Sequence, residues 1–270
     1  MRNLPWILVS LILLSFVLLK IPNGKRSTIN YKLPTANSQL PTNITPLIYP
    51  KDSWQYFLQH LPAENGPILD FRGHPIDNQE KHYAILTFDV GNADLQQCAD
   101  ALMRLRAEYL FSQKAFDQIG FHFNAGIYYS FSGYLKGLRP IFRGRNQILS
   151  LTNMPSETSH ASLRKYLDIV YAYANTVSLC KELKITDRLE TGTVIIFPGN
   201  PGHCSIIADA AVNAKADTVF KLVEGYMPAQ SIYVLANPYE PGLNPWYHLG
   251  KGEINTASCS FRSYYLRKFE

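Results

Sequence analysis

Hydrophobic residues recur at two different spacings in this chain, one helical and one alternating. Residues 94–113, DLQQCADALMRLRAEYLFSQ, carry apolar positions every three or four residues: Leu95, Cys98, Leu102, Leu105 and Tyr109. This spacing predicts an amphipathic helix. Asp94 and Gln97 lie three residues apart, as in a capping box, which places the predicted start of that helix at Asp94.

Three other segments have patterns of their own. Residues 51–61, KDSWQYFLQHL, predict a short amphipathic helix, and residues 162–184, SLRKYLDIVYAYANTVSLCKELK, predict a second long one. Residues 67–76 and 82–90 are apolar runs on either side of a polar turn, which predicts a β-hairpin.

The C-terminal third contains short apolar runs typical of strands. They are TVIIF (193–197), HCSIIAD (203–209), TVFKLVE (218–224) and SIYVL (231–235). Helices come first and neighbouring strands afterwards, so the pattern predicts an α+β fold with N-terminal helices packed on a mostly antiparallel sheet.

The N-terminal residues predict export and set the expected domain boundaries. Residues 4–19 are an apolar run between Arg2 and Lys20, with no Ala-x-Ala-like cleavage site after them. We therefore expect residues 1–20 to be a signal anchor or a signal peptide, and the protein to be extracytoplasmic, either membrane-anchored or secreted. Residues 21–50 are rich in Pro, Thr, Asn and Ser and predict a disordered linker, which leaves residues 51–270 as one globular domain.

Charge and cysteine content narrow the classes of function. The net charge of +5 over 270 residues is diffuse, so we expect no nucleic-acid partner. The chain has no Cys-x-x-Cys pair and no zinc-ligand spacing, so we expect neither a metal site nor another cofactor. The disulfide state of Cys180, Cys204 and Cys259 stays open, because an exported protein permits disulfides.

Two side chains suggest nucleophilic chemistry. His203 follows a Gly-Asn-Pro-Gly turn and opens a strand; Cys204 points to the opposite face, so partners of His203 must come from other elements. Cys98 lies near the start of a predicted helix, where the helix dipole favours a thiolate. The alternative is that Cys98, on the apolar stripe, is a small buried hydrophobe.

A third side chain would orient the histidine. Glu224 is in phase with Phe220 and Leu222, so it faces the core if they do, and a buried carboxylate needs a partner. His203 on a neighbouring strand would supply one. The alternatives are that Glu224 is solvated at the rim of the sheet, or that Gln230 is the orienting residue.

Residues 192–207, GTVIIFPGNPGHCSII, resemble a segment of the papain-like superfamily, in particular the NlpC- and CHAP-type amidases and peptidases. Those proteins place a cysteine at the start of a helix and later have Gly-Asp-x-apolar, a turn and Gly-His-apolar-apolar. Thr193 stands here where the aspartate is usual, and QQCAD lacks the usual Cys-Ser/Ala-Gly. The resemblance implies a papain-like fold.

It also implies roles for individual residues. Cys98 would attack an amide carbonyl, and His203 would act as general base and then acid. Glu224 or Gln230 would orient the imidazole, and the Cys98 N–H with Gln96 or Gln97 would stabilise the oxyanion.

A second resemblance covers residues 51–270. Segments such as LQQCADALMRLRAEYLF, PGHCSIIADAA and GYMPAQSIYVLANP look like those of a domain-of-unknown-function family of exported bacterial proteins. This second resemblance implies export and a single domain, and it brings no activity with it. Taken with the papain-like resemblance, it leads us to expect an exported cysteine-dependent amide hydrolase that acts on a peptide or glycopeptide of the cell envelope and contacts the membrane through its N-terminal segment. The alternative is a non-catalytic envelope module that binds glycan or peptide on the same scaffold.

Overall fold

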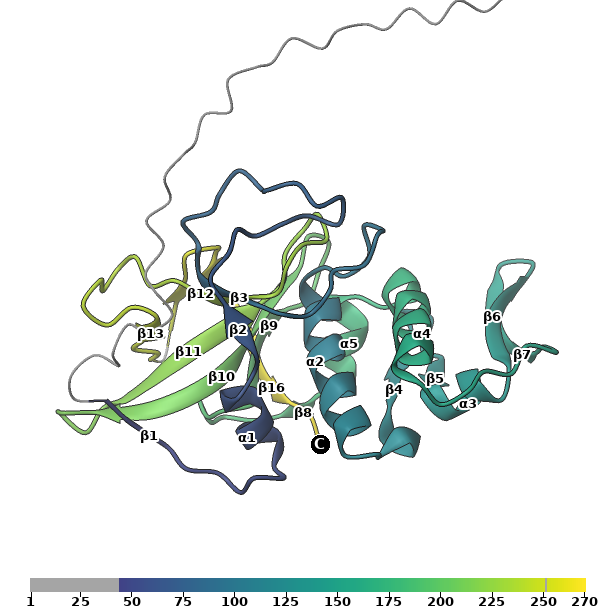
Figure 1. Ribbon diagram of the computed structural model, residues 1–270, viewed down its shortest axis with the longest axis horizontal. Coiled ribbons are helices and arrows are strands. Elements are labelled where there is room, and N and C mark those ends of the chain that lie inside the picture. Colours follow the sequence, from purple (N-terminus) through teal and green to yellow (C-terminus); the bar gives the residue numbers. More distant parts are fainter. Residues whose placement is uncertain (1–43, 251) are drawn as a thin grey trace, which may run out of the picture. The chain divides into compact units, whose positions relative to one another are not determined.

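The structure is a computed structural model that describes residues 44–250 and 252–270. Its largest element is a ten-stranded antiparallel sheet (Figure 1). The strands run in the order β2-β3-β12-β11-β10-β9-β16-β8, with β1 paired to β10 and β13 paired to β11. Their bounds are β1 Ile44–Pro46, β2 Ala63–Glu64, β3 His82–Leu86, β8 Lys184–Ile185, β9 Thr193–Phe197, β10 His203–Asn213, β11 Thr218–Glu224, β12 Tyr233–Leu235, β13 Trp246–Tyr247 and β16 Tyr265–Lys268.

The remaining elements are helices and three small hairpins. The helices are α1 Trp54–Gln59, α2 Cys98–Ser112, the 3-10 turn η1 Phe116–Gln118, α3 Phe131–Leu135, α4 His160–Tyr173 and α5 Thr176–Glu182. The hairpins pair β4 Gly120–His122 with β5 Tyr128–Ser130, β6 Leu138–Arg143 with β7 Asn146–Leu151, and β14 Ile254–Asn255 with β15 Ser260–Phe261.

The two faces of the sheet belong to different parts of the core. Cys204, Ile206 and Ala208 of β10 pack in one hydrophobic cluster with residues of α1, α2, α4 and α5. Ile207 and Ala210 belong to a second cluster, which includes Ile254 and Phe261 of the β14–β15 hairpin. Side chains alternate across a strand, so α2 packs on the face to which Cys204 points. This is a mixed α/β fold with helices gathered on one face of an antiparallel sheet.

The four predicted C-terminal strands are confirmed as β9, β10, β11 and β12, and the short helix predicted in residues 51–61 is confirmed as α1. The single long helix predicted over residues 162–184 is wrong, because the chain forms α4 and α5 there. Asn175 separates them: its side chain accepts hydrogen bonds from the backbone N–H groups of Val177 and Ser178 and so caps α5. Asparagine is among the preferred residues at this position, and the apolar spacing alone did not reveal the break.

The predicted pairing of residues 67–76 with residues 82–90 is also wrong. β3 pairs instead with β2 and β12. Residues 67–76 fold back on themselves through a bridge between Leu69 and Pro75. Gln79 explains the difference, since its side chain bonds both the N–H and the C=O of Ile68 and ties the polar connection to that turn.

The end of the predicted linker belongs to the folded domain. β1 pairs with Ala211–Asn213 of β10, the Leu47 carbonyl accepts a hydrogen bond from Gln59, and Tyr49 donates one to Thr191. The rest of that linker, residues 21–43, and the signal anchor predicted at residues 1–20 lie outside the described residues. In residues 44–250 and 252–270, no helix has the length and apolar character needed to cross a membrane.

Candidate active site

Cys98 is the first residue of α2. The backbone N–H of Gln97 donates to Oδ2 of Asp100 at 3.0 Å, which is one half of a capping box. The predicted start at Asp94 is therefore wrong: Asp94 Oδ1 accepts from the backbone N–H of Ala229 at 2.7 Å and from the Gln97 side chain. The later start places Cys98 in the first turn, where the helix dipole favours a thiolate most.

The Cys98 thiol is buried against the beginning of β10. Its sulfur lies 3.9 Å from the carbonyl oxygen of Gly202 and contacts the side chains of His203 and Cys204. The hydrogen bond from the Cys204 thiol and the interactions with the His203 imidazole outweigh burial and lower the pKa of Cys98 to about 5. Cys98 is thus a thiolate near neutral pH.

The His203 imidazole connects Cys98 to a carboxylate. Nε2 of His203 lies 2.9 Å from Oε2 of Glu224, which leaves Nδ1 for the thiol. Burial by itself would lower the pKa of His203, but the negative charge of Glu224 and the contact with Cys98 raise it to about 10. The rings of Phe261 and Tyr226 pack on the imidazole, with centroids 5.7 Å and 5.1 Å away, and shield it from water.

Glu224 is fully buried and fully hydrogen-bonded. Oε2 also accepts from Ser205 Oγ at 2.6 Å, and Oε1 accepts from the Tyr233 hydroxyl at 2.6 Å. Burial would raise the pKa of Glu224, but His203 and these donors lower it. The strand phase of β11 predicts this burial, and the interpretation of Glu224 as a solvated rim residue is wrong.

Two of the proposed partners lie elsewhere. Gln230 precedes β12 and forms a backbone bridge to Asp70. The residue that binds the His203 imidazole is Glu224 and not Gln230. Gln96 is bound elsewhere, because its Oε1 accepts from Arg104 at 3.2 Å and its Nε2 donates to the carbonyl oxygen of Asp89 at 3.5 Å. Gln97 remains beside Cys98 and lines the same cavity.

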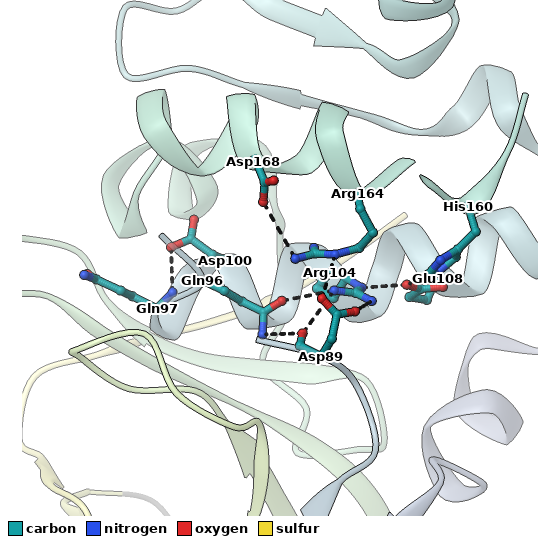
Figure 2. Close-up of polar contacts among 9 residues, drawn as sticks. All are labelled: Asp89, Gln96, Gln97, Asp100, Arg104, Glu108, His160, Arg164 and Asp168. Carbon is teal, nitrogen blue, oxygen red and sulfur yellow. Dashed lines mark hydrogen bonds and ion pairs between the residues drawn. The ribbon is translucent and has the colours of Figure 1, made fainter. Parts of the chain in front are cut away.

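Arg104 is the centre of a cluster of polar contacts that joins α2, α4 and the loop before α2 (Figure 2). Its side chain is 1% exposed and binds Glu108 at 2.6 Å and Asp89 at 3.0 Å, while Asp89 also binds Arg164 of α4. The Arg104–Glu108 pair, four residues apart on α2, is therefore buried and not solvated on the helix surface. The cluster holds the segment between Asp89 and Gln97 against α2 and α4 and so fixes the start of the helix. Sequence spacing gives no signal for it, because Asp89 lies in a loop and Arg164 on another helix.

A cavity of about 230 Å³ opens beside Cys98. It lies between the start of α2, the junction of α4 and α5, and residues 199–202. The N–H of a residue in the first turn of a helix has no intrahelical acceptor, so the Cys98 N–H can bind a group that enters this cavity. One N–H of the Gln97 amide donates to Asp94 at 3.1 Å, which leaves the second for the same purpose.

All four cysteines are free thiols. Burial raises the pKa of Cys204 well above its usual range and that of Cys259 to about 12, so those two thiols stay protonated where Cys98 is ionised. Within the part of the chain that the structure describes, no group of His, Cys, Asp and Glu side chains has the arrangement of a metal site.

The fold and the site define a mixed α/β protein with a buried Cys–His–Glu cluster next to a cavity. The chain belongs to the family described as domain of unknown function 4846 (DUF4846), whose model matches residues 35–268. No curated protein and no solved structure matches the chain. The family description carries no activity.

Proposed function

We propose that this protein is a cysteine-dependent amide hydrolase with a papain-like arrangement of its catalytic residues. The observation that carries the proposal is the contact of the Cys98 thiol, at the start of α2, with His203, whose Nε2 is 2.9 Å from Glu224. A nucleophile, a base and a residue that orients the base are the three parts that nucleophilic catalysis requires.

The reaction proceeds through an acyl-enzyme. The Cys98 thiolate attacks the amide carbonyl carbon, and the negative charge that develops on oxygen is met by the Cys98 N–H and the Gln97 side chain. The His203 imidazolium gives its proton to the leaving nitrogen, and the amine departs, which leaves a thioester on Cys98. A water molecule then transfers a proton to His203 and attacks the thioester, releasing a carboxylate and restoring the thiolate.

Glu224 keeps the imidazole in place through both steps. It bears a negative charge opposite the cationic form of His203, and Ser205 and Tyr233 fix its two oxygens. Lys81 adds a second buried cation near this carboxylate, with its ammonium 4.3 Å from the centroid of the Tyr226 ring and 5.1 Å from that of Tyr233. A buried cluster of charges is costly unless it is paired in this way. Such clusters of groups with shifted pKa values are typical of active sites, which favours catalysis over ligand binding alone.

The proposed substrate is a peptide of the cell envelope, and the proposed location is extracytoplasmic. The apolar run of residues 4–19 supports export, and the resemblance of residues 192–207 to cell-wall amidases and peptidases supports the substrate class. A cavity lined by polar residues such as Asn175, Thr176 and Asn200 suits an extended peptide, which offers hydrogen-bonding groups along its backbone.

The direct test is hydrolysis of cell-wall stem peptides and of a set of unrelated peptides, followed by mass spectrometry of the new amino termini. Cys98→Ala is expected to abolish product formation, because it removes the thiol that forms the thioester. Cys259→Ala is the matched control, since that thiol is protonated and lies outside the cluster, and it is expected to retain activity. Product formation that survives Cys98→Ala would refute the proposal.

A further inference from the structure

We propose that Cys98 and Cys204 form a reversible disulfide when the protein meets a peroxide, so that Cys204 is the resolving thiol of a redox-controlled nucleophile. This inference rests on the proposed function, because it takes Cys98 to be the reactive thiolate. It adds a modification site and a means of regulation to that function.

The fold places the two thiols against each other. Cys98 opens α2, which packs on the face of the sheet to which Cys204 points, and both residues belong to the same hydrophobic cluster. The Cys98 sulfur lies 3.9 Å from the carbonyl oxygen of Gly202, two residues before Cys204. The Cys98 and Cys204 side chains interact with each other, so the two thiols are neighbours in the reduced protein.

The two thiols differ in access and in ionisation. Cys98 lines the cavity and is 7% exposed, whereas Cys204 is 0% exposed. A small oxidant in the cavity therefore reaches Cys98 first. Thiolates are oxidised much faster than thiols, and Cys98 is the ionised member of the pair.

The chemistry needs only hydrogen peroxide as oxidant. The Cys98 thiolate attacks one peroxide oxygen, the O–O bond breaks, and hydroxide leaves, which gives a sulfenic acid on Cys98. The Cys204 thiol then attacks the Cys98 sulfur; the S–S bond forms and the sulfenic oxygen leaves as water, taking up the thiol proton. The disulfide removes the nucleophile, and a thiol reductant restores both residues.

A nearby resolving thiol also protects Cys98 from irreversible damage. A sulfenic acid without a partner is oxidised further to sulfinic acid, which thiol reductants do not reverse. Because Cys204 lies next to Cys98, the disulfide forms before a second peroxide molecule oxidises the sulfenic acid. We therefore expect peroxide to cause a loss of activity that a thiol reductant reverses.

The test is intact-mass and peptide-mass analysis of the full chain after treatment with hydrogen peroxide, with iodoacetamide labelling of Cys98 in an untreated sample. We expect a loss of two hydrogens, a Cys98–Cys204 linked peptide, and full recovery of labelling after dithiothreitol. Cys204→Ser keeps a hydroxyl donor next to the thiolate but cannot form the disulfide. It is expected to gain two oxygens on Cys98 and to recover less than about one tenth of its labelling.

The possible failures are distinguishable. If Cys98 labels in the untreated protein but is oxidised to sulfinic acid in the wild type as fast as in Cys204→Ser, the redox proposal is wrong and the hydrolase proposal stands. A disulfide between Cys98 and Cys259 also overturns the assignment of Cys204. If Cys98 labels only in denaturant, both proposals fall. Cys204→Ala provides a second variant in case the serine is not tolerated in the core.

Discussion

Nε2 of His203 and Oε2 of Glu224 are 2.9 Å apart, although the residues lie on strands β10 and β11 and are separated by 21 positions in the sequence. Both side chains are buried, with 7% and 0% of their surfaces exposed. The Glu224 carboxylate stabilises the charged form of the His203 imidazole. The charged imidazole in turn stabilises the Cys98 thiolate.

Replacing Glu224 with glutamine is expected to lower the free energy of unfolding by roughly 3–5 kcal/mol at the pH where the effect is largest, because it leaves a buried imidazolium without its counter-charge. Glu224 has a lowered folded pKa, so its contribution is present above about 4.5 and is lost as pH falls. His203 has a raised folded pKa, so its contribution is complete below about 6.5 and is lost as pH rises toward about 10. The difference between the wild type and Glu224→Gln is therefore largest from about pH 4.5 to 6.5.

Urea unfolding at pH 5.5 and pH 9.5 measures this difference. Glu240→Gln is the matched control, because Glu240 pairs with His248 at 3.0 Å but both side chains are more than two-fifths exposed. That surface pair is expected to contribute less than about 1 kcal/mol at either pH. Equal costs for the two substitutions would show that the buried pair does not stabilise the protein.

The hydroxyl of Tyr233 tests whether the carboxylate is charged. Tyr233→Phe removes a donor to Glu224 and is expected to lower the free energy of unfolding by about 1.5–3 kcal/mol, as for hydrogen bonds to charged groups. Tyr129→Phe is the comparison, since that buried hydroxyl donates to the neutral carbonyl of Leu138 at 2.8 Å and is expected to cost about 0.5–1.5 kcal/mol. A smaller loss for Tyr233→Phe than for Tyr129→Phe would contradict an ionised Glu224.

The sequence predicted the parts of the site that depend on strand periodicity. Strand phase predicts that Glu224 faces the core if Phe220 and Leu222 do, with His203 of a neighbouring strand as its partner, because a period of two decides the face of every residue in a strand. In the structure both side chains are buried and 2.9 Å apart. The sequence did not decide between Glu224 and Gln230. Gln230 lies before β12, where no periodicity fixes the direction of its side chain.

Interactions between distant segments account for what the sequence did not reveal. The start of α2 was misplaced because Asp94 and Gln97 fit a capping box, whereas Asp94 is bound by the backbone of Ala229. Gln96 is taken up by distant residues in the same way, because its Oε1 accepts from Arg104 and its Nε2 donates to the Asp89 carbonyl. A local pattern cannot show that a side chain is already occupied by a residue from another element.

The boundary of the domain gives a further prediction. A chain that begins at residue 51 is expected to be less stable than one that begins at residue 44, by about 1–3 kcal/mol, because it lacks the pairing of β1 with β10 and the bond from Tyr49 to Thr191. Thermal or urea unfolding of the two chains measures this. Indistinguishable midpoints would show that residues 44–50 do not contribute to the fold.

The rate at which iodoacetamide alkylates Cys98 in the folded protein, measured as a function of pH, shows whether Cys98 is the activated nucleophile. We expect a rate that rises through an inflection near pH 5 in the wild type, because His203 and Cys204 hold Cys98 as a thiolate. In His203→Ala the inflection is expected to move up toward the value of about 8.5 for a free cysteine. An inflection near 8.5 in the wild type, or alkylation only after denaturant is added, would contradict the account.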